Sequence, residues 1–272
     1  MKRLVILGAA VAGLMGIAAH AQVSDAIIKN AFSPYEKTPP SAPGYQPGMR
    51  ITAKNVDAVE GILDPFTFRY VKKGWLEIPT TPTFSLPQNS NYIEATRRSA
   101  HKVQLAPDGT LLNFEAGRPF PQEPDAKDPQ AGLKLMWNFQ RGINAGDSET
   151  INPFWWTFRN TKTGQSERQL RFDWHFLNWK HRTMFDPKPD ITPNPGQIFR
   201  SISSTVLEPF DLANTQLLIW RYENDLQRDD GWLYLGFQRR VRPPAGGQTT
   251  AALLGTDAAL ADFQGHHRRL SA

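Results

Sequence analysis

The stretch Gln169-Leu170-Arg171-Phe172-Asp173-Trp174-His175-Phe176 alternates polar and apolar side chains without exception. Successive side chains of a β-strand point to opposite faces, so this stretch predicts a strand with one aromatic face and one polar face. The segment Trp155–Asn160 precedes it across the turn residues 162–165, and we expect the two to pair as an antiparallel hairpin. At residues 176–177 the apolar positions change from even to odd numbers, which predicts a β-bulge or a bend there.

Other strand signals follow in the C-terminal third of the chain. A candidate strand at Gln197–Val206 comes after a proline-rich loop at Asp186–Gly196. The region Leu217–Arg242 then consists of short aromatic segments divided by the turn residues Asp229-Asp230-Gly231. Earlier, Pro107-Asp108-Gly109 predicts the turn of another hairpin. These signals together predict an antiparallel sheet.

One helix is predicted between Asp128 and Gly142. Asp128 suits an N-cap position, Pro129 suits the first helical position because no amide donor is needed there, and Gly142 is a natural stop. An apolar stripe at helical spacing should be buried against the sheet. The stripe consists of Leu133, Met136, Trp137 and Gln140, widened by Leu135 and Phe139.

The composition favours β structure and excludes several chemistries. The chain has 22 prolines, which interrupt long helices, and 16 phenylalanines, 8 tryptophans and 6 tyrosines, which favour sheet faces. It has no cysteine, which excludes disulfides, thiolate zinc sites, a cysteine nucleophile and a lipid-modified N-terminal cysteine. The formal charge of +5 is spread along the chain rather than gathered in a block, so no nucleic-acid partner is predicted.

The first residues have the form of a secretory signal. Lys2 and Arg3 supply the positive start, residues 4–18 are apolar or small, and Ala19-His20-Ala21 offers small residues to a signal peptidase. The alternative is an uncleaved membrane anchor, but the uncharged stretch is shorter than the roughly 20 residues that cross a bilayer. We expect cleavage after Ala21 and a periplasmic or secreted protein that begins at Gln22.

The remaining chain divides unevenly. Residues 22–54 are expected to form an extended segment, because prolines crowd its second half and large apolar residues are few. Residues 55–265 are expected to form one β-rich domain, followed by a disordered tail at 266–272.

Several stretches, in order, resemble the domain of unknown function 1329 family of secreted proteins from Gram-negative bacteria. The matching pieces are Ala116–Pro121, Asp128-Pro129 to Trp137-Asn138, Pro209–Leu212, Arg221-Tyr222 with Asp230–Arg242, and Gly255-Thr256-Asp257 with Asp262–Gly265. The resemblance implies an α+β fold similar to the lipoprotein carriers LolA and LolB, in which a curved antiparallel sheet forms a half-barrel with helices packed on its concave face. It carries over no catalytic residue and no cofactor. Members usually continue past the last matching piece, so the resemblance also implies that closing strands are missing here.

Such proteins tend to be encoded beside resistance-nodulation-division transporters and outer-membrane proteins. The resemblance therefore implies a periplasmic, non-enzymatic binder or carrier of a hydrophobic ligand or lipid, with an envelope transporter or outer-membrane protein as a partner. The rival hypotheses are a secreted carbohydrate-active hydrolase and a structural subunit of an envelope assembly.

The aromatic side chains are the candidate ligand-binding residues, and the alternative is that they are ordinary core. The candidates are Trp137, Trp155, Trp156, Phe172, Trp174, Phe176, Trp220, Trp232 and Tyr234.

Two groups of polar residues are candidates for chemistry, and neither is predicted to be a site. His175 and His181, with Asp173 and Asp186 nearby, fit no regular ligand spacing, so no metal is predicted. The carboxylates Glu223, Asp229 and Asp230, or Asp173 with Glu167, could be posed as a glycosidase pair, but Asp229-Asp230-Gly231 is more simply a turn.

Arg239, Arg240 and Arg242 lie on what is predicted to be a strand. They either protect a sheet edge from further pairing or form a docking patch for an acidic partner or an anionic lipid head group.

Overall fold

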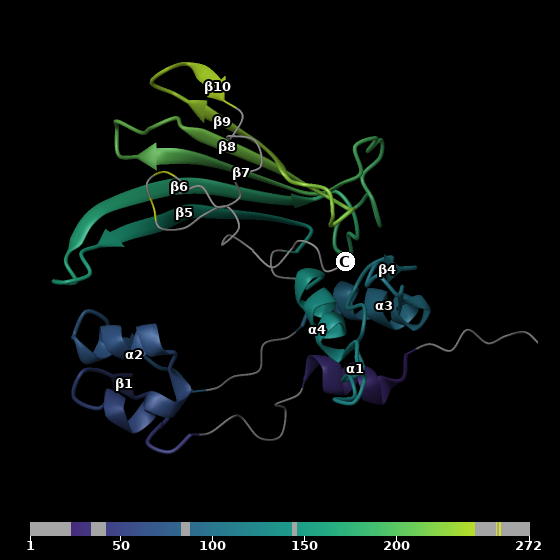
Figure 1. The fold of residues 1–272 in the computed structure, drawn as a ribbon, viewed down its shortest axis with the longest axis horizontal. Coiled ribbons are helices and arrows are strands. Elements are labelled where there is room, and N and C mark those ends of the chain that lie inside the picture. The colour runs from purple at the N-terminus through teal and green to yellow at the C-terminus, as the bar shows by residue number, and fades with distance from the viewer. Residues whose placement is uncertain are drawn as a thin grey trace, which may run out of the picture.

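The protein, described here from a computed structural model, is an α+β fold around an open six-stranded antiparallel sheet (Figure 1). The structure describes residues 23–33, 42–82, 88–142 and 146–242, with the single positions Leu254 and Thr256. The sheet order is β10-β9-β8-β7-β6-β5, so each strand pairs with its neighbour in sequence, and the two edge strands do not pair with each other. The strands are β5 (Ser148–Arg159), β6 (Ser166–Asn178), β7 (Ile198–Glu208), β8 (Gln216–Tyr222), β9 (Asp230–Leu235) and β10 (Arg240–Arg242). The predicted fold class and the antiparallel sheet are confirmed.

Helices and short strands lie on the concave side of this sheet (Figure 1). The helices are α1 (Asp25–Phe32), α2 (Pro65–Lys72), α3 (Ser90–Ser99) and α4 (Ala131–Gln140), with the 3₁₀ segments η1 (Val56–Ile62) and η2 (Ala100–Lys102). Two small two-stranded sheets pair β1 (Arg50–Ile51) with β2 (Ile78–Pro79), and β3 (Gln104–Leu105) with β4 (Leu111–Leu112). The second of these is the hairpin predicted around residues 107–109. Within the described residues, no helix is both long and apolar enough to cross a membrane.

The alternation that predicts β6 is also the pattern of its burial. Leu170, Phe172, Trp174 and Phe176 are buried, and the residues between them face the other side. The same face continues across the sheet, since Phe176 lies opposite Ile202 in β7, and Ile202 lies opposite Ile219 in β8. We call this the core face of the sheet, and the other side the opposite face.

Of the two alternatives predicted at residues 176–177, the β-bulge is wrong. Pairing of β6 with both neighbouring strands is continuous there, and the register instead shifts in β5 between Ile151 and Phe154. Pro153 lies within that shift, and proline has no amide hydrogen for the ladder. The odd-numbered apolar position Trp179 lies beyond the end of β6, where its indole donates to Ser201 Oγ at 3.1 Å.

Helix α4 begins later and buries less than predicted. Gln130 is its N-cap, while Asp128 forms the preceding turn by accepting from the amide of Gln130 at 2.9 Å. Trp137 is buried and its indole donates to the carbonyl of Gly109 at 3.0 Å. Leu135 and Phe139 are exposed, so the expectation of a wide stripe buried against the sheet is wrong. The described residues of the sheet's core cluster include none from α4, which explains the difference.

The described residues of the segment 22–54 contain the helix α1 and the strand β1. The hydroxyl of Ser24 caps α1 by accepting from the amide of Ile27 at 3.4 Å, and Ile28 and Phe32 pack against Tyr92 of α3. Residues 42–82 form a small second cluster around Ile51, Val56, Val59 and Val71. The predicted signal sequence and the tail at 266–272 lie outside the described residues.

The small cluster touches the sheet at the turn between β5 and β6. Gly164 in that turn has φ +73°, and a Cβ there would lie 2.3 Å from the indole of Trp75, which precedes β2. Glycine is therefore required for both the backbone conformation and the close packing.

Candidate functional site

The nine candidate aromatic residues lie in three separate places. Trp156, Phe172, Trp174 and Phe176 are on the core face. Four others are on the opposite face, because each is the neighbour in sequence of a residue that points to the core face. They are Trp155, Trp220, Trp232 and Tyr234. Trp137 is in α4. A ligand bound to one face of the sheet would therefore contact at most part of this set.

On the core face the aromatic rings form one continuous layer. The ring centroids of Trp156 and Phe172 are 4.8 Å apart, those of Phe154 and Trp174 are 5.5 Å apart, and those of Phe172 and Trp174 are 5.8 Å apart. Phe154, Trp156 and Phe158 on the edge strand β5 are only partly buried. Leu254, from beyond β10, packs against this layer. The arrangement is an apolar surface that is partly accessible along one edge.

On the opposite face the aromatic residues form a smaller group. Trp220 and Trp232 make an edge-to-face contact with ring centroids 4.8 Å apart, and both are half-buried. The rest of this face is largely polar where it crosses β6 and β7. These rings therefore support each other rather than line a hollow.

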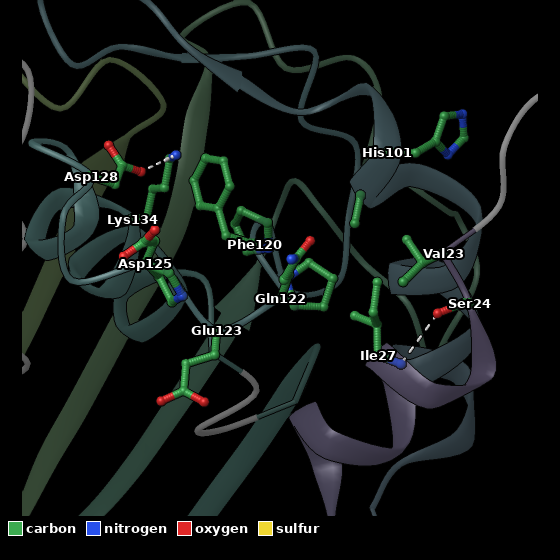
Figure 2. A pocket seen from close by; sticks show the side chains of 14 residues that line it. Val23, Ser24, Ile27, His101, Phe120, Gln122, Glu123, Asp125, Asp128 and Lys134 are labelled. Carbon is green, nitrogen blue, oxygen red and sulfur yellow. Dashed lines mark hydrogen bonds and ion pairs between the residues drawn. The ribbon is translucent and has the colours of Figure 1, made fainter.

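A cavity of about 580 Å³ opens between α1, η2, the loop after Gly117 and the start of α4 (Figure 2). Figure 2 shows Val23 and Ile27 on the α1 side, and Phe120, Asp128 and Lys134 on the other. Its apolar lining comes from Val23, Ile27, Ala100, Pro119, Phe120, Pro121 and Pro124. The polar residues on its lining are Ser24, His101, Gln122, Glu123, Asp125, Asp128 and Lys134.

The loop that carries Pro119 and Phe120 is held in place by three contacts. Gly117 has φ +88°, and a Cβ there would lie 2.5 Å from the backbone nitrogen of Thr96. The amide of Arg118 donates to Thr96 Oγ1 at 2.8 Å. Asn138 of α4 both accepts from the amide of Phe120 and donates to its carbonyl, at 2.8 and 2.7 Å. These contacts fix the backbone that carries this part of the lining.

Charges gather at one side of the cavity. Lys134 donates to Asp128 at 2.5 Å and lies 5.8 Å from the ring centre of Phe120. The hydrogen bond from Lys134 lowers the pKa of Asp128 below its usual range. Because Glu123 and Asp125 are also on the lining, this side of the cavity carries a net negative charge.

A second polar group, which we call the charged corner, joins α4 to the end of β8. Arg141 donates to Glu223 Oε1 at 3.1 Å, and His181 Nε2 lies 2.9 Å from Glu223 Oε2. His181 Nδ1 lies 2.6 Å from the carbonyl oxygen of Glu115. A carbonyl and an ionised carboxylate can only accept hydrogen bonds, so a ring nitrogen of His181 that bonds to either of them is the donor.

Burial alone would raise the pKa of Glu223. Attraction to Arg141 and the hydrogen bond from His181 outweigh that effect and lower the pKa of Glu223 to about 2. Burial also lowers the pKa of Arg141, whose guanidinium lies 4.3 Å from the ring centre of Phe199. The charged corner thus connects α4 to the sheet through a buried ion pair and hydrogen bonds.

The carboxylates considered for hydrolysis are engaged in such contacts. Asp229 pairs with Arg221 at 3.4 Å, and Asp230 accepts from the hydroxyl of Tyr222 at 2.5 Å. Glu167 accepts from Asn160 at 2.8 Å. Asp173 lies 3.1 Å from His175 on the opposite face of the sheet.

The two candidate histidines are not together. His175 is on the opposite face of the sheet, whereas His181 is in the charged corner. Among the residues that the structure describes, no three His, Asp or Glu side chains converge as metal ligands would.

Sequence reasoning missed the cavity as a site. None of the nine candidate aromatics lines it. The nearest signal was the motif Ala116–Pro121, which carries the family resemblance and supplies Pro119, Phe120 and Pro121 to the lining.

Comparison with known proteins finds a family and two solved structures. A family model described as "Protein of unknown function (DUF1329)" matches residues 50–265. No curated protein matches. A DUF1329 family protein from Desulfovibrio piger ATCC 29098 is 19% identical over 51% of this chain and 50% of its own, with a TM-score of 0.38. An outer membrane lipoprotein-sorting protein domain from Vibrio parahaemolyticus is 18% identical over 48% of this chain and 45% of its own, with a TM-score of 0.34. The chain thus spans about half the length of each structure or less.

Proposed function

Because the chain belongs to the DUF1329 family, whose description names no activity, we propose from its own geometry that it is a non-enzymatic binder of a hydrophobic molecule in the cell envelope. The observation that carries the proposal is the cavity of about 580 Å³ between α1, η2 and α4. Pockets for small ligands typically measure about 300–1,000 Å³ and combine an apolar lining with a few polar groups. This cavity fits both descriptions.

The lining favours an apolar ligand body with a polar end. Ile27, Phe120 and three prolines provide rigid apolar surface, and each CH₂ that a ligand buries contributes about 0.8 kcal/mol. Asp125 and Glu123 place negative charge at one side, which favours a ligand whose polar end is a hydrogen-bond donor or a cation.

The location in the envelope and the transfer of a ligand to a partner are proposed from the sequence. The N-terminal signal pattern supports a periplasmic location. The family resemblance supports an envelope transporter or an outer-membrane protein as the partner to which a ligand would be passed. The ion pairs and hydrogen bonds of Glu223, Asp229 and Asp230 favour binding over hydrolysis, because these carboxylates face basic, hydroxyl and imidazole groups of the protein.

The core face is a second location for the same function. Phe154, Trp156 and Phe158 are partly buried along the edge strand, so a ligand could reach the aromatic layer of Trp156, Phe172, Trp174 and Phe176 there. The two locations predict different responses to substitution.

The experiment is identification of co-purified molecules by mass spectrometry, followed by titration of the delipidated protein with a hydrophobic fluorescent dye. Ile27→Trp fills the cavity and should weaken saturable binding about tenfold or more. Ile62→Trp, at an exposed position in η1, is the matched control and should leave binding unchanged.

Trp156→Ala separates the two locations. Loss of binding in this variant, with Ile27→Trp unaffected, would move the site to the core face. An absence of any co-purified or saturably bound hydrophobic molecule would contradict the proposal.

A further inference from the structure

Two phenylalanine rings project from one end of the sheet. Phe210, in the turn between β7 and β8, is 97% exposed, and Phe237, in the turn between β9 and β10, is 64% exposed. The two turns touch, since a Cβ at Gly236 would lie 2.9 Å from the carbonyl oxygen of Ala213. Both turns are at the end of the sheet away from α1, α3 and α4 (Figure 1). The two turns therefore form one protruding apolar surface.

Unneutralised positive charge lies beside these rings. Arg239 and Arg240 are exposed, and within the described part of the chain neither forms an ion pair. Two other arginines at the same end do, since Arg168 faces Asp211 at 3.9 Å and Arg171 faces Glu208 at 2.6 Å. Two cations without an acidic partner among the described residues thus lie next to Phe237.

Protection of a sheet edge does not account for this arrangement. Arg239 lies in the turn, before β10 begins, where no strand pairing needs to be blocked. Phe210 is an apolar ring almost fully in water, which protection of an edge would not require. The combination of protruding rings and flanking arginines instead matches a surface that lies at a lipid interface, where rings enter the head-group boundary and arginines meet anionic head groups.

We propose that this protruding surface, formed by Phe210, Phe237, Arg239 and Arg240, docks reversibly on a membrane that contains anionic lipid. Two rings and two charges provide a weak, salt-sensitive contact rather than an anchor. The inference does not depend on the ligand proposal, because the cavity lies at the other end of the sheet. Docking would place the protein at a membrane while leaving the cavity free.

The test is co-sedimentation of the full mature protein with phosphatidylethanolamine vesicles that contain phosphatidylglycerol, and with neutral phosphatidylcholine vesicles. The wild type should bind the anionic vesicles, bind the neutral ones much less, and be released by high salt. Phe210→Ser with Phe237→Ser should weaken binding about tenfold or more, since each buried ring contributes an amount typical of a phenylalanine. Arg239→Gln with Arg240→Gln should weaken it about 25-fold, because each arginine near an anionic surface contributes roughly a factor of five.

Phe66→Ser is the matched control. Phe66 is 67% exposed, and the guanidinium of Arg69 lies 5.3 Å from its ring centre, but it is in α2. It should bind vesicles as the wild type does. All these side chains are exposed, so thermal unfolding and dye binding should be unchanged. Equal binding to neutral vesicles, equal loss in Phe66→Ser, or no binding by the wild type above the level of the double phenylalanine variant would overturn the proposal.

Discussion

On the core face of the sheet Trp174 is 1% exposed, whereas Trp155 on the opposite face is 45% exposed. Both faces carry tryptophans, and the two residues sit in adjacent, paired strands. What separates them is register, because a shift of one residue moves a side chain from one face to the other. The aromatic content of a strand therefore says little about which rings support the fold and which are available for contacts. Substitutions can test how far this difference extends.

The sharpest test replaces one tryptophan on each face. Trp174→Ala removes a ring that contacts Phe154, Phe172 and Phe176, and it should lower the free energy of unfolding by about 3–5 kcal/mol. Trp155→Ala should cost about 1 kcal/mol or less, because nearly half of this residue is exposed to water. Urea titration followed by far-ultraviolet circular dichroism measures both. Similar costs would show that the two faces do not differ as described.

A second test asks whether the charged corner is as important as the apolar part of the core face. Glu223→Gln leaves the buried guanidinium of Arg141 without its carboxylate and should lower the free energy of unfolding by about 3 kcal/mol. Glu208→Gln breaks the more exposed pair with Arg171 and should cost about 1 kcal/mol or less. Chemical denaturation at neutral pH gives both values, and a loss in Glu223→Gln no larger than in its control would show that the corner is not a stabilising joint.

The same carboxylate predicts a dependence on pH. The pKa of Glu223 is lowered from its ordinary 4.5 to about 2 in the folded protein. Its contribution, about 3 kcal/mol, is fully present above pH 4.5 and is lost as the pH falls through about 2. Unfolding measured between pH 6 and pH 2 should show this loss in the wild type and much less of it in Glu223→Gln. Parallel curves for the two proteins would rule out the assignment.

A smaller loss of stability is expected from a substitution in the turn between β5 and β6. Gly164→Ala must adopt φ +73° and push against the indole of Trp75, and should cost about 2 kcal/mol. Combining Gly164→Ala with Trp75→Ala removes the steric part of this cost but not the part that comes from the backbone conformation. Thermal unfolding of the two single variants and the double variant separates them. Additive costs would mean that Trp75 does not pack against this turn.

Parts of this structure could be predicted from the sequence because their cause is local. The burial of β6 follows from strict alternation, and the turns around residues 109 and 164 follow from glycine and proline. The predicted bulge failed because apolar residues in a loop, such as Trp179, look like strand residues that have changed face. The wide stripe on α4 failed because periodicity shows which residues share a helix face, but not whether another element covers that face.

The sites could not be predicted, because their residues are far apart in the sequence. The cavity draws its lining from residues near 23, 100, 120 and 134, whose meeting depends on how the helices dock. The charged corner joins Arg141 to Glu223, 82 residues away, and His181 to Glu223, 42 residues away. Neither pairing leaves a pattern in sequence spacing, and only the family motif at residues 116–121 marked one wall of the cavity.

The finest distinction concerns the tryptophan pair on the opposite face. Trp220→Ala should lower the free energy of unfolding by about 1 kcal/mol, because the ring is half-buried and its main aromatic contact is Trp232 at 4.8 Å. Trp220→Ala with Trp232→Ala should cost less than the sum of the two single changes, by about 0.5–1.5 kcal/mol, since each single change already removes the contact. Urea titration of the four proteins in the cycle gives the coupling. A coupling near zero would mean that the two rings are held independently, whereas a cost for Trp220→Ala close to that of Trp174→Ala would mean that another element covers the opposite face in solution.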